Sequence, residues 1–99
     1  MDIPVNLSNA SVPYSYLISE NVPNPFLQQT NFNIFLAMPQ FVTYDLYDIT
    51  GKLVYSQTIG MTSEGNHSIQ IDKGKLVSGM YEVVFRIGID TKTFKILIF

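Results

Sequence analysis

Apolar and polar residues alternate along most of the chain with a period of two, which places successive side chains on opposite faces of a β-strand. The clearest alternation runs through segments 30–38, 41–47 and 79–87. We expect these segments to point the following residues into a core: Phe32, Ile34, Leu36 and Met38; Val42, Tyr44 and Leu46; Tyr81, Val83, Phe85 and Ile87. Weaker runs predict further strands at 14–19, 53–59, 67–71 and 91–99. No window shows a helical period, so the pattern predicts an all-β protein.

Turn-forming residues separate these runs at short intervals. Pro23-Asn24-Pro25 interrupts the chain, because proline lacks a backbone donor and favours extended geometry in the residue before it. Asp48-Ile49-Thr50-Gly51 predicts a type I turn that its glycine closes in the left-handed conformation. About seven short strands with such spacing are typical of a single antiparallel β-sandwich of the immunoglobulin-like or fibronectin III-like kind. We expect the sandwich to span residues 13–99, with residues 1–12 as a linker or loosely held first segment.

Composition narrows the classes that remain. The chain has 99 residues, of which 46% are hydrophobic and 14% charged, too apolar for a disordered tail. Its net charge of −2 argues against nucleic-acid binding, and no apolar run is long enough to span a membrane. The absence of cysteine excludes disulfides and thiol chemistry. The start of the sequence lacks the features of a signal peptide, so we expect a fragment of a longer protein.

Residues that could carry catalysis or bind a metal are few and scattered. The one histidine, His67, has no Cys, Asp or Glu at ligand spacing, which favours a structural role in a turn. Asp45 and Asp48 are interpreted as a solvated strand residue and a turn-capping residue. The glycines occur singly, so no phosphate-binding loop is predicted. We therefore expect no enzyme activity, no cofactor and no metal site.

The final strand carries apolar residues on both faces. Phe94, Ile96 and Ile98 suit the core, whereas Leu97 and Phe99 fall on the outward face. One interpretation is a central strand buried on both sides. The other is an exposed edge strand offered to a partner, which would also allow self-association through this edge.

Five short motifs occur in a characteristic order along the chain. They comprise Pro23, Asn24, Pro25 and Phe26; Tyr47, Asp48, Gly51 and Lys52; Gly65 and His67; Ser78, Gly79 and Tyr81; and a basic-then-aliphatic ending from Lys92 to Ile98. In this order they resemble the type A C-terminal sorting domains of proteins exported by the type IX (Por) secretion system. The resemblance covers approximately residues 14–99 and also implies an immunoglobulin-like sandwich.

The resemblance implies a sorting signal rather than a catalyst. Such a domain follows a cargo domain, crosses the periplasm, and is recognised by the outer-membrane translocon of Gram-negative bacteria. A sortase-like peptidase then removes it, and the cargo is released or attached to the cell surface. The family's recognition of its last strands maps here onto Lys92, Lys95, Ile96, Leu97 and Ile98.

Two other functions remain open from the residues alone. Small β-sandwiches also serve as binding or spacer modules of secreted proteins, since fold does not fix function. Here Phe35, Phe41 and Tyr47 lie on the outward parity of their strands and are the candidates for contact with carbohydrate or protein. A small hydrolase is the weakest alternative, because one histidine and dispersed carboxylates do not supply a nucleophile with its base.

Overall fold

The computed structural model describes residues 16–20 and 22–99, which form seven strands and no helix. The strands are β1 (Tyr16–Ile18), β2 (Gln29–Leu36), β3 (Gln40–Asp48), β4 (Leu53–Thr62), β5 (Gly65–Asp72), β6 (Gly79–Ile87) and β7 (Asp90–Ile98). Each predicted strand is therefore confirmed within a few residues at its ends. The linker predicted at 1–12, and residues 13–15 of the predicted domain, lie outside the described residues.

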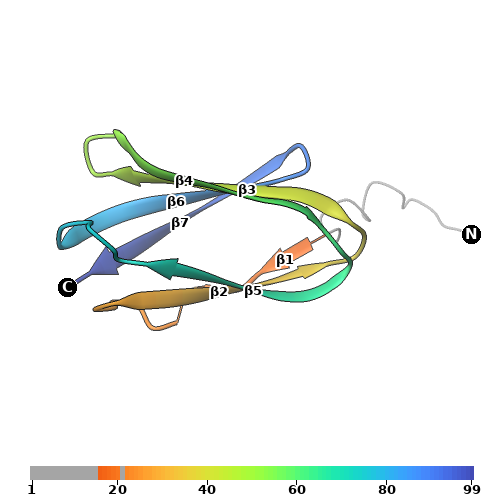
Figure 1. The fold of residues 1–99 in the computed structure, drawn as a ribbon, viewed down its shortest axis with the longest axis horizontal. Helices are drawn as coiled ribbons and strands as arrows, with labels where there is room; N and C mark the ends of the chain where they lie inside the picture. Colours follow the sequence, from red (N-terminus) through yellow and green to blue (C-terminus); the bar gives the residue numbers. More distant parts are fainter. Residues whose placement is uncertain (1–15, 21) are drawn as a thin grey trace, which may run out of the picture.

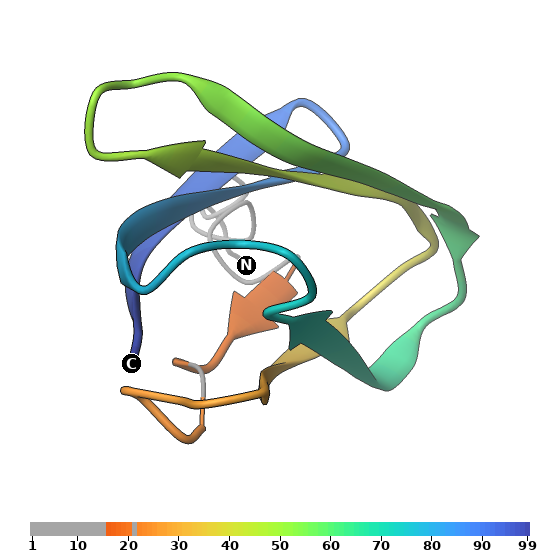
Figure 2. The same cartoon turned by 60° about the vertical axis from the view of Figure 1, so that its left-hand side comes forward.

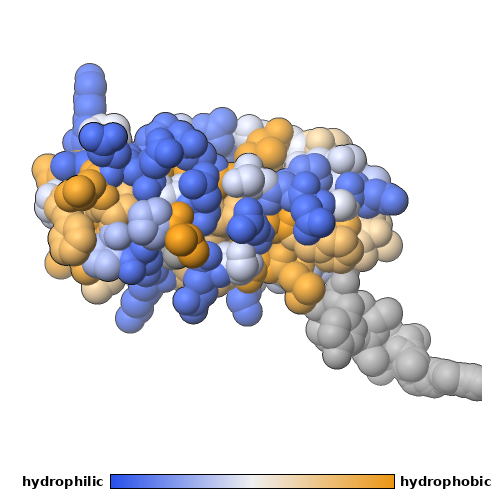
Figure 3. Space-filling model, turned by 90° about the horizontal axis from the view of Figure 1, so that it is seen from below, coloured by the Kyte–Doolittle hydropathy of each residue, from blue (hydrophilic) through white to orange (hydrophobic). Residues whose placement is uncertain are grey.

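The strands form two antiparallel sheets that face each other as a sandwich (Figure 1). One sheet has three strands in the order β1-β2-β5, and the other has four in the order β4-β3-β6-β7. Figure 3 looks onto the three-stranded sheet, where hydrophilic side chains cover much of the surface and apolar ones lie between them. The all-β sandwich predicted from the alternation is confirmed.

The core lies between the sheets and is formed mainly by the side chains that the alternation predicts to point inward. Phe32 packs edge-on against Phe85 with ring centroids 5.0 Å apart, and Phe94 lies 5.1 Å from Phe32. Aromatic pairs in such tilted geometries add to the free energy gained from burial alone. Phe32 and Phe85 are both fully buried, and they come from opposite sheets, so their contact fixes the two layers together.

Met38 departs from the predicted core, because 54% of its surface is exposed. The strand that should carry it ends at Leu36, and the chain then bends through Ala37 before it enters β3 at Gln40. Once the extended geometry ends, the two-residue period no longer decides which way a side chain points. The alternation correctly predicts the buried face of β2 but overestimates its length by one period.

Candidate functional site

The final strand, β7, lies at the edge of the four-stranded sheet, where β6 is the only strand that pairs with it in the described chain. This position rules out the interpretation as a central strand, which would have a neighbouring strand on both sides. The C-terminal end of β7 nevertheless has a backbone partner on its other edge. Figure 2 shows it close to the segment that precedes β2, and Phe26 of that segment forms a parallel bridge with Ile98.

Three hydrogen bonds attach this segment to the end of β7. The backbone N–H of Phe26 donates to the carbonyl of Leu97 (3.0 Å), and the N–H of Phe99 donates to the carbonyl of Phe26 (2.9 Å). The side-chain oxygen Oδ1 of Asn24 accepts from the N–H of Leu97 at 3.0 Å. Residues 24–26 thus serve as a short edge partner for a strand more than 70 positions away, and we call them the edge cover.

The edge cover is itself held in place from the inside. The peptide bonds before Pro23 and Pro25 are both cis. Phe26 is 2% exposed and belongs to the core cluster between the sheets. The carbonyl of Pro23 accepts a 2.7 Å hydrogen bond from the hydroxyl of Thr30, a polar residue that is fully buried in β2. Through these contacts the proline-rich motif joins the core, β2 and β7.

The remainder of the β7 edge has no backbone partner among the described residues. Backbone N–H and C=O groups alternate between the two edges of a strand. Because Leu97 directs its groups to the edge cover, Thr91, Thr93 and Lys95 direct theirs to the same side. No described segment pairs with that stretch. An open edge of this kind is a template for pairing with another chain.

The residues predicted to take part in recognition divide between the two faces of β7. Ile96 and Ile98 are 0% and 1% exposed, so their side chains belong to the core. Lys95 is exposed on the outward face, and Leu97 beside it is partly exposed. Lys92 falls on the inward parity but is exposed, because it lies near the start of the strand. Of these five residues, only Lys92, Lys95 and Leu97 can offer side chains to a partner in the folded domain.

A shallow hollow of about 420 Å³ connects Lys95 with the turn between β3 and β4. Its lining comes from residues 48–51 together with Met80, Tyr81, Glu82 and Lys95. Glu82 and Lys95 are direct cross-strand partners on β6 and β7. The Tyr47–Lys52 motif and one predicted recognition residue, which are far apart in the sequence, therefore share one surface.

Asp48 organises the turn beside this hollow. Its Oδ1 accepts hydrogen bonds from the backbone N–H of Thr50 (2.9 Å), the hydroxyl of Thr50 (2.6 Å) and the N–H of Lys52 (3.1 Å). These bonds, led by that from the Thr50 hydroxyl, lower the pKa of Asp48. Gly51 adopts a φ of +87°, which glycine tolerates without steric cost. The predicted turn-capping role of Asp48 is confirmed by these contacts.

The Ser78–Tyr81 motif has a structural explanation that the alternation did not reveal. The hydroxyl of Tyr81 donates a 2.6 Å hydrogen bond to the carbonyl of Val77, four residues earlier. A tyrosine near the start of a strand that returns to the preceding loop in this way is a known corner of β-sandwiches. Gly79 between them has a φ of +151°. The signal was present in the spacing of tyrosine after a loop, but its hydroxyl partner was not predicted.

The Gly65–His67 motif lies away from β7. Gly65 opens β5 opposite Leu36 of β2, on the three-stranded sheet. His67 Nε2 is 2.7 Å from the carbonyl of Ser63 in the preceding turn. This contact supports the structural interpretation of the histidine. Among the described residues no group of three or more His, Cys, Asp or Glu side chains could hold a metal ion.

The three outward aromatic residues do not form one binding surface. Phe35 is exposed on the three-stranded sheet, whereas Phe41 and Tyr47 belong to β3 of the other sheet. Tyr47 is only partly exposed. Phe41 and Tyr47 are six positions apart, which corresponds to about 20 Å along a strand. The three rings thus lie apart from one another, and a contact of any one of them with carbohydrate or protein stays a prediction.

The arrangement around β7 combines an exposed strand edge, two lysines and a proline-rich cover. A search of curated proteins gives no match to the chain. No helix in the described part of the chain is long and apolar enough to cross a membrane. The family described as the secretion system C-terminal sorting domain matches residues 22–99. The chain therefore belongs to the C-terminal sorting domains of type IX secretion cargo.

Proposed function

We propose that the type IX translocon recognises this domain through the open edge of β7, with Lys92, Lys95 and Leu97 as the contacting side chains. Membership of the family makes the domain a C-terminal sorting signal, and it implies export to the cell surface or the extracellular space. Our proposal concerns the residues through which the translocon contacts the domain. Ile96 and Ile98 act indirectly, because as core residues they fix the strand that presents their neighbours.

The observation that carries this proposal is the division of β7 into a covered end and an open stretch. Natural proteins usually cover or charge a strand edge to prevent pairing with other chains. Here the edge cover protects Leu97, whereas the backbone groups of Thr91, Thr93 and Lys95 stay available. Lys92 and Lys95 lie within that stretch and have no ion-pair partner among the described residues. A partner strand with acidic side chains fits both features.

The route and the fate of the cargo belong to the same proposal. The domain follows an upstream cargo domain through the periplasm and meets the translocon as a folded unit. A sortase-like peptidase then removes it, and the cargo is released or attached to the cell surface. The domain itself contributes no catalysis. Its one histidine is engaged with the carbonyl of Ser63, which supports a structural role.

A secretion assay tests the recognition surface. The chain is fused behind a periplasmic reporter in a host with the type IX pathway, and extracellular reporter is measured. We expect the double variant Lys92→Glu, Lys95→Glu to lower secretion about tenfold, because reversed charges repel the partner that the lysines attract. Deletion of residues 92–99 should abolish secretion.

The control is Lys75→Glu, which reverses an exposed lysine in the loop between β5 and β6, on the other flank of the sandwich. It should secrete as the unmodified chain does. Thermal unfolding of each purified domain shows whether a variant is still folded. Unchanged secretion of the double lysine variant would reject β7 as the recognition surface, and unchanged secretion after the deletion would reject any role of the last strand.

A further inference from the structure

The flank opposite β7 carries a second open edge, on β5. β5 pairs with β2 alone in the described chain, and its register is regular from Gly65 to Asp72. The N–H of Lys73 donates to the carbonyl of Gln28, which shows that odd-numbered residues of this segment face β2. The N–H of Asn31 and the carbonyl of Asn33 bond in the other direction, to Val22 and Ser19. Their partners across the ladder, Gln70 and Ser68, therefore turn their backbone groups outward to the free edge.

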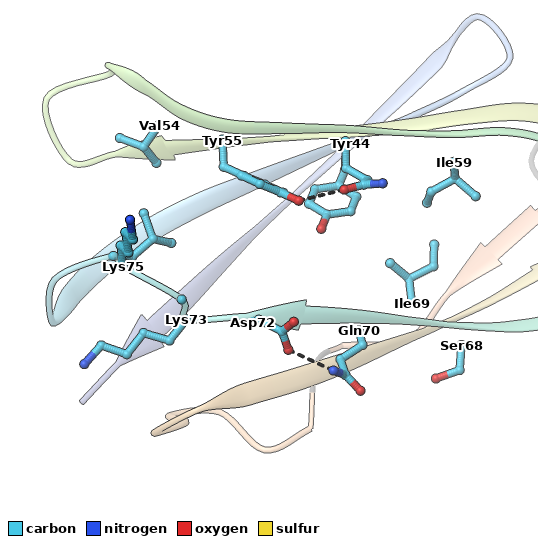
Figure 4. A pocket seen from close by; sticks show the side chains of 13 residues that line it. Tyr44, Val54, Tyr55, Ile59, Ser68, Ile69, Gln70, Asp72, Lys73 and Lys75 are labelled. Carbon is cyan, nitrogen blue, oxygen red and sulfur yellow. Dashed lines mark hydrogen bonds between the residues drawn. The ribbon is translucent and has the colours of Figure 1, made fainter.

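This edge borders a cleft of about 730 Å³ between β5 and β4 (Figure 4). The lining includes Ser68, Gln70 and Asp72. Figure 4 shows the side chains of Ser68 and Gln70 directed away from the opening, whereas Ile69 and Ile59 point into it from opposite sheets. The cleft is thus bounded by apolar side chains and by the backbone edge of β5. Its volume lies within the range of ~300–1,000 Å³ found for ligand sites.

Three side chains that line the cleft could contact a bound ligand. Tyr44 is 4% exposed, its hydroxyl points into the cleft, and it has no hydrogen-bond partner among the described residues. Burial, with smaller effects of Tyr55 and Asp72, raises the pKa of Tyr44 to about 12, so the hydroxyl remains a donor at neutral pH. Tyr55 and Ile59 lie over the cleft, yet 46% and 37% of their surfaces are exposed. A buried donor without a partner is costly unless something in the cleft accepts its bond.

We propose that the β5 edge binds an extended peptide segment of a partner protein as an added strand, antiparallel to β5, with apolar side chains at alternate positions and acidic residues at its N-terminal end. Free backbone groups at Ser68, Gln70 and Asp72 recur every second residue, and a β-strand is the ligand whose own groups have that repeat. The inward side chains of the added strand fill the cleft beneath Tyr55 and Ile59. Lys73 and Lys75 line the end of the cleft and attract the acidic residues.

The neighbouring edge of β4 is a poorer template for such a strand. Its pairing with β3 contains two register shifts, between Val42 and Thr43 and between Leu46 and Tyr47. Bulges bend a strand and break the even spacing of its outward backbone groups. The ladder between β2 and β5 has no such shift over its length. This interaction goes beyond the sorting function, because it uses the flank remote from β7.

A peptide titration of the ¹⁵N-labelled chain tests the proposal. The probe is the synthetic peptide acetyl-Asp-Asp-Val-Thr-Val-Thr-Val-amide, and its control is the same peptide with N-methyl groups on alternate backbone nitrogens. We expect saturable shifts of the Ser68, Gln70 and Asp72 amide signals and slower hydrogen exchange at these amides. The N-methylated peptide should bind at least about tenfold more weakly, because it cannot donate to the edge.

Two variants locate the site on the protein. Gln70→Pro removes an N–H that faces the open edge and spares the bonds to β2, so it should weaken binding about tenfold without unfolding the domain. The double variant Lys73→Glu, Lys75→Glu serves as a second probe should the proline disturb the strand, and it should weaken binding about tenfold as well. Arg86→Glu, which reverses an exposed cation on β6, should bind as the unmodified chain. Absent shifts, shifts confined to β4 or β7 and missing from β5, or equal binding of the N-methylated peptide would overturn the proposal.

Discussion

At the scale of single residues, short polar side chains replace backbone partners at the points where the ladders end. Asp48 accepts three hydrogen bonds within its own turn. Asn24 accepts one from a strand remote in the sequence. Both side chains are short enough to hold an oxygen near the backbone without the entropy cost of a longer chain. Asp and Asn therefore suit these two positions of this chain.

The turn at Asp48 leads to a prediction with a pH dependence. Asp48→Ala should lower the thermal unfolding midpoint at pH 7, since the N–H groups of Thr50 and Lys52 lose their acceptor. The pKa of Asp48 is lowered in the folded protein from its usual 3.8, so its carboxylate stabilises the fold above that pH. The stabilisation disappears as the pH falls through the folded-state pKa.

Calorimetry of the two proteins over ~5 pH units, from neutral pH down into acid, measures this difference. The gap between unmodified chain and variant should be largest at neutral pH and close in acid. Glu64→Ala is the matched control, because Glu64 is exposed and has no described partner. A gap that is constant across the pH range would contradict a role of the charged carboxylate.

At the scale of elements, β7 has hydrogen-bonded partners on both of its edges, and the two partners differ in length. β6 pairs with it over its whole length, from Ile87 opposite Asp90 to Gly79 opposite Ile98. The edge cover pairs only with its C-terminal end, through Asn24 and Phe26. Strand edges with fewer partners open more often by local unfolding. The stretch proposed for recognition is therefore the part of β7 that should open most readily by local unfolding.

The edge cover is tested by Asn24→Ala, which removes the acceptor of the Leu97 N–H. We expect a loss of about 1 kcal/mol in the free energy of unfolding, the usual net value of one hydrogen bond. The Leu97 amide should also exchange faster with deuterium, while amides of β2 that lie within the ladder keep their rates. Asn24→Asp, which retains an oxygen at the same place, should restore most of the protection.

The matched control for this variant is Asn66→Ala, since Asn66 is exposed and its side chain has no described partner. Denaturant unfolding and amide exchange monitored by NMR supply the two measurements. Equal exchange of the Leu97 amide in Asn24→Ala and in the unmodified chain would show that the edge cover does not need the asparagine.

At the scale of the whole molecule, Phe26 is the residue that closes the sandwich on the β7 flank. Its side chain is buried in the shared core, and its backbone bonds to β7, although it belongs to the segment leading into β2 of the opposite sheet. The opposite flank has no such closing residue among those described and instead carries the cleft between β4 and β5. The two flanks therefore have different surfaces, since Phe26 closes one and the cleft lies on the other. One flank can take part in sorting while the other binds a separate partner.

Phe26→Ala should therefore cost more than truncation of an outward residue. We expect about 3–5 kcal/mol, the range for a buried phenylalanine, out of a total stability of about 5–15 kcal/mol. Denaturant unfolding of the purified domain measures the loss, with Phe35→Ala on the outer face of β2 as control. A cost for Phe26→Ala no greater than that of the control would mean that the flank is closed by other contacts.

The sequence by itself determined the strands and the inward face of each. Alternation depends only on local geometry, so Phe32, Tyr44 and Phe85 could be assigned to the core without knowledge of their partners. It failed at Met38, where the extended geometry stops before the pattern does. The turn at Asp48 was equally predictable, because a turn closes within a few residues.

Only the tertiary structure decided which edges stay open and what covers them. Parity cannot tell an edge strand from a central one, so the position of β7 and the free edge of β5 depend on how distant strands are ordered. The bond between Asn24 and Leu97 joins residues that no local pattern relates. The surfaces proposed for recognition are backbone edges. Since every residue carries nearly the same backbone groups, the order of the strands in each sheet decides which of these groups stay unpaired. The side chains do not decide it.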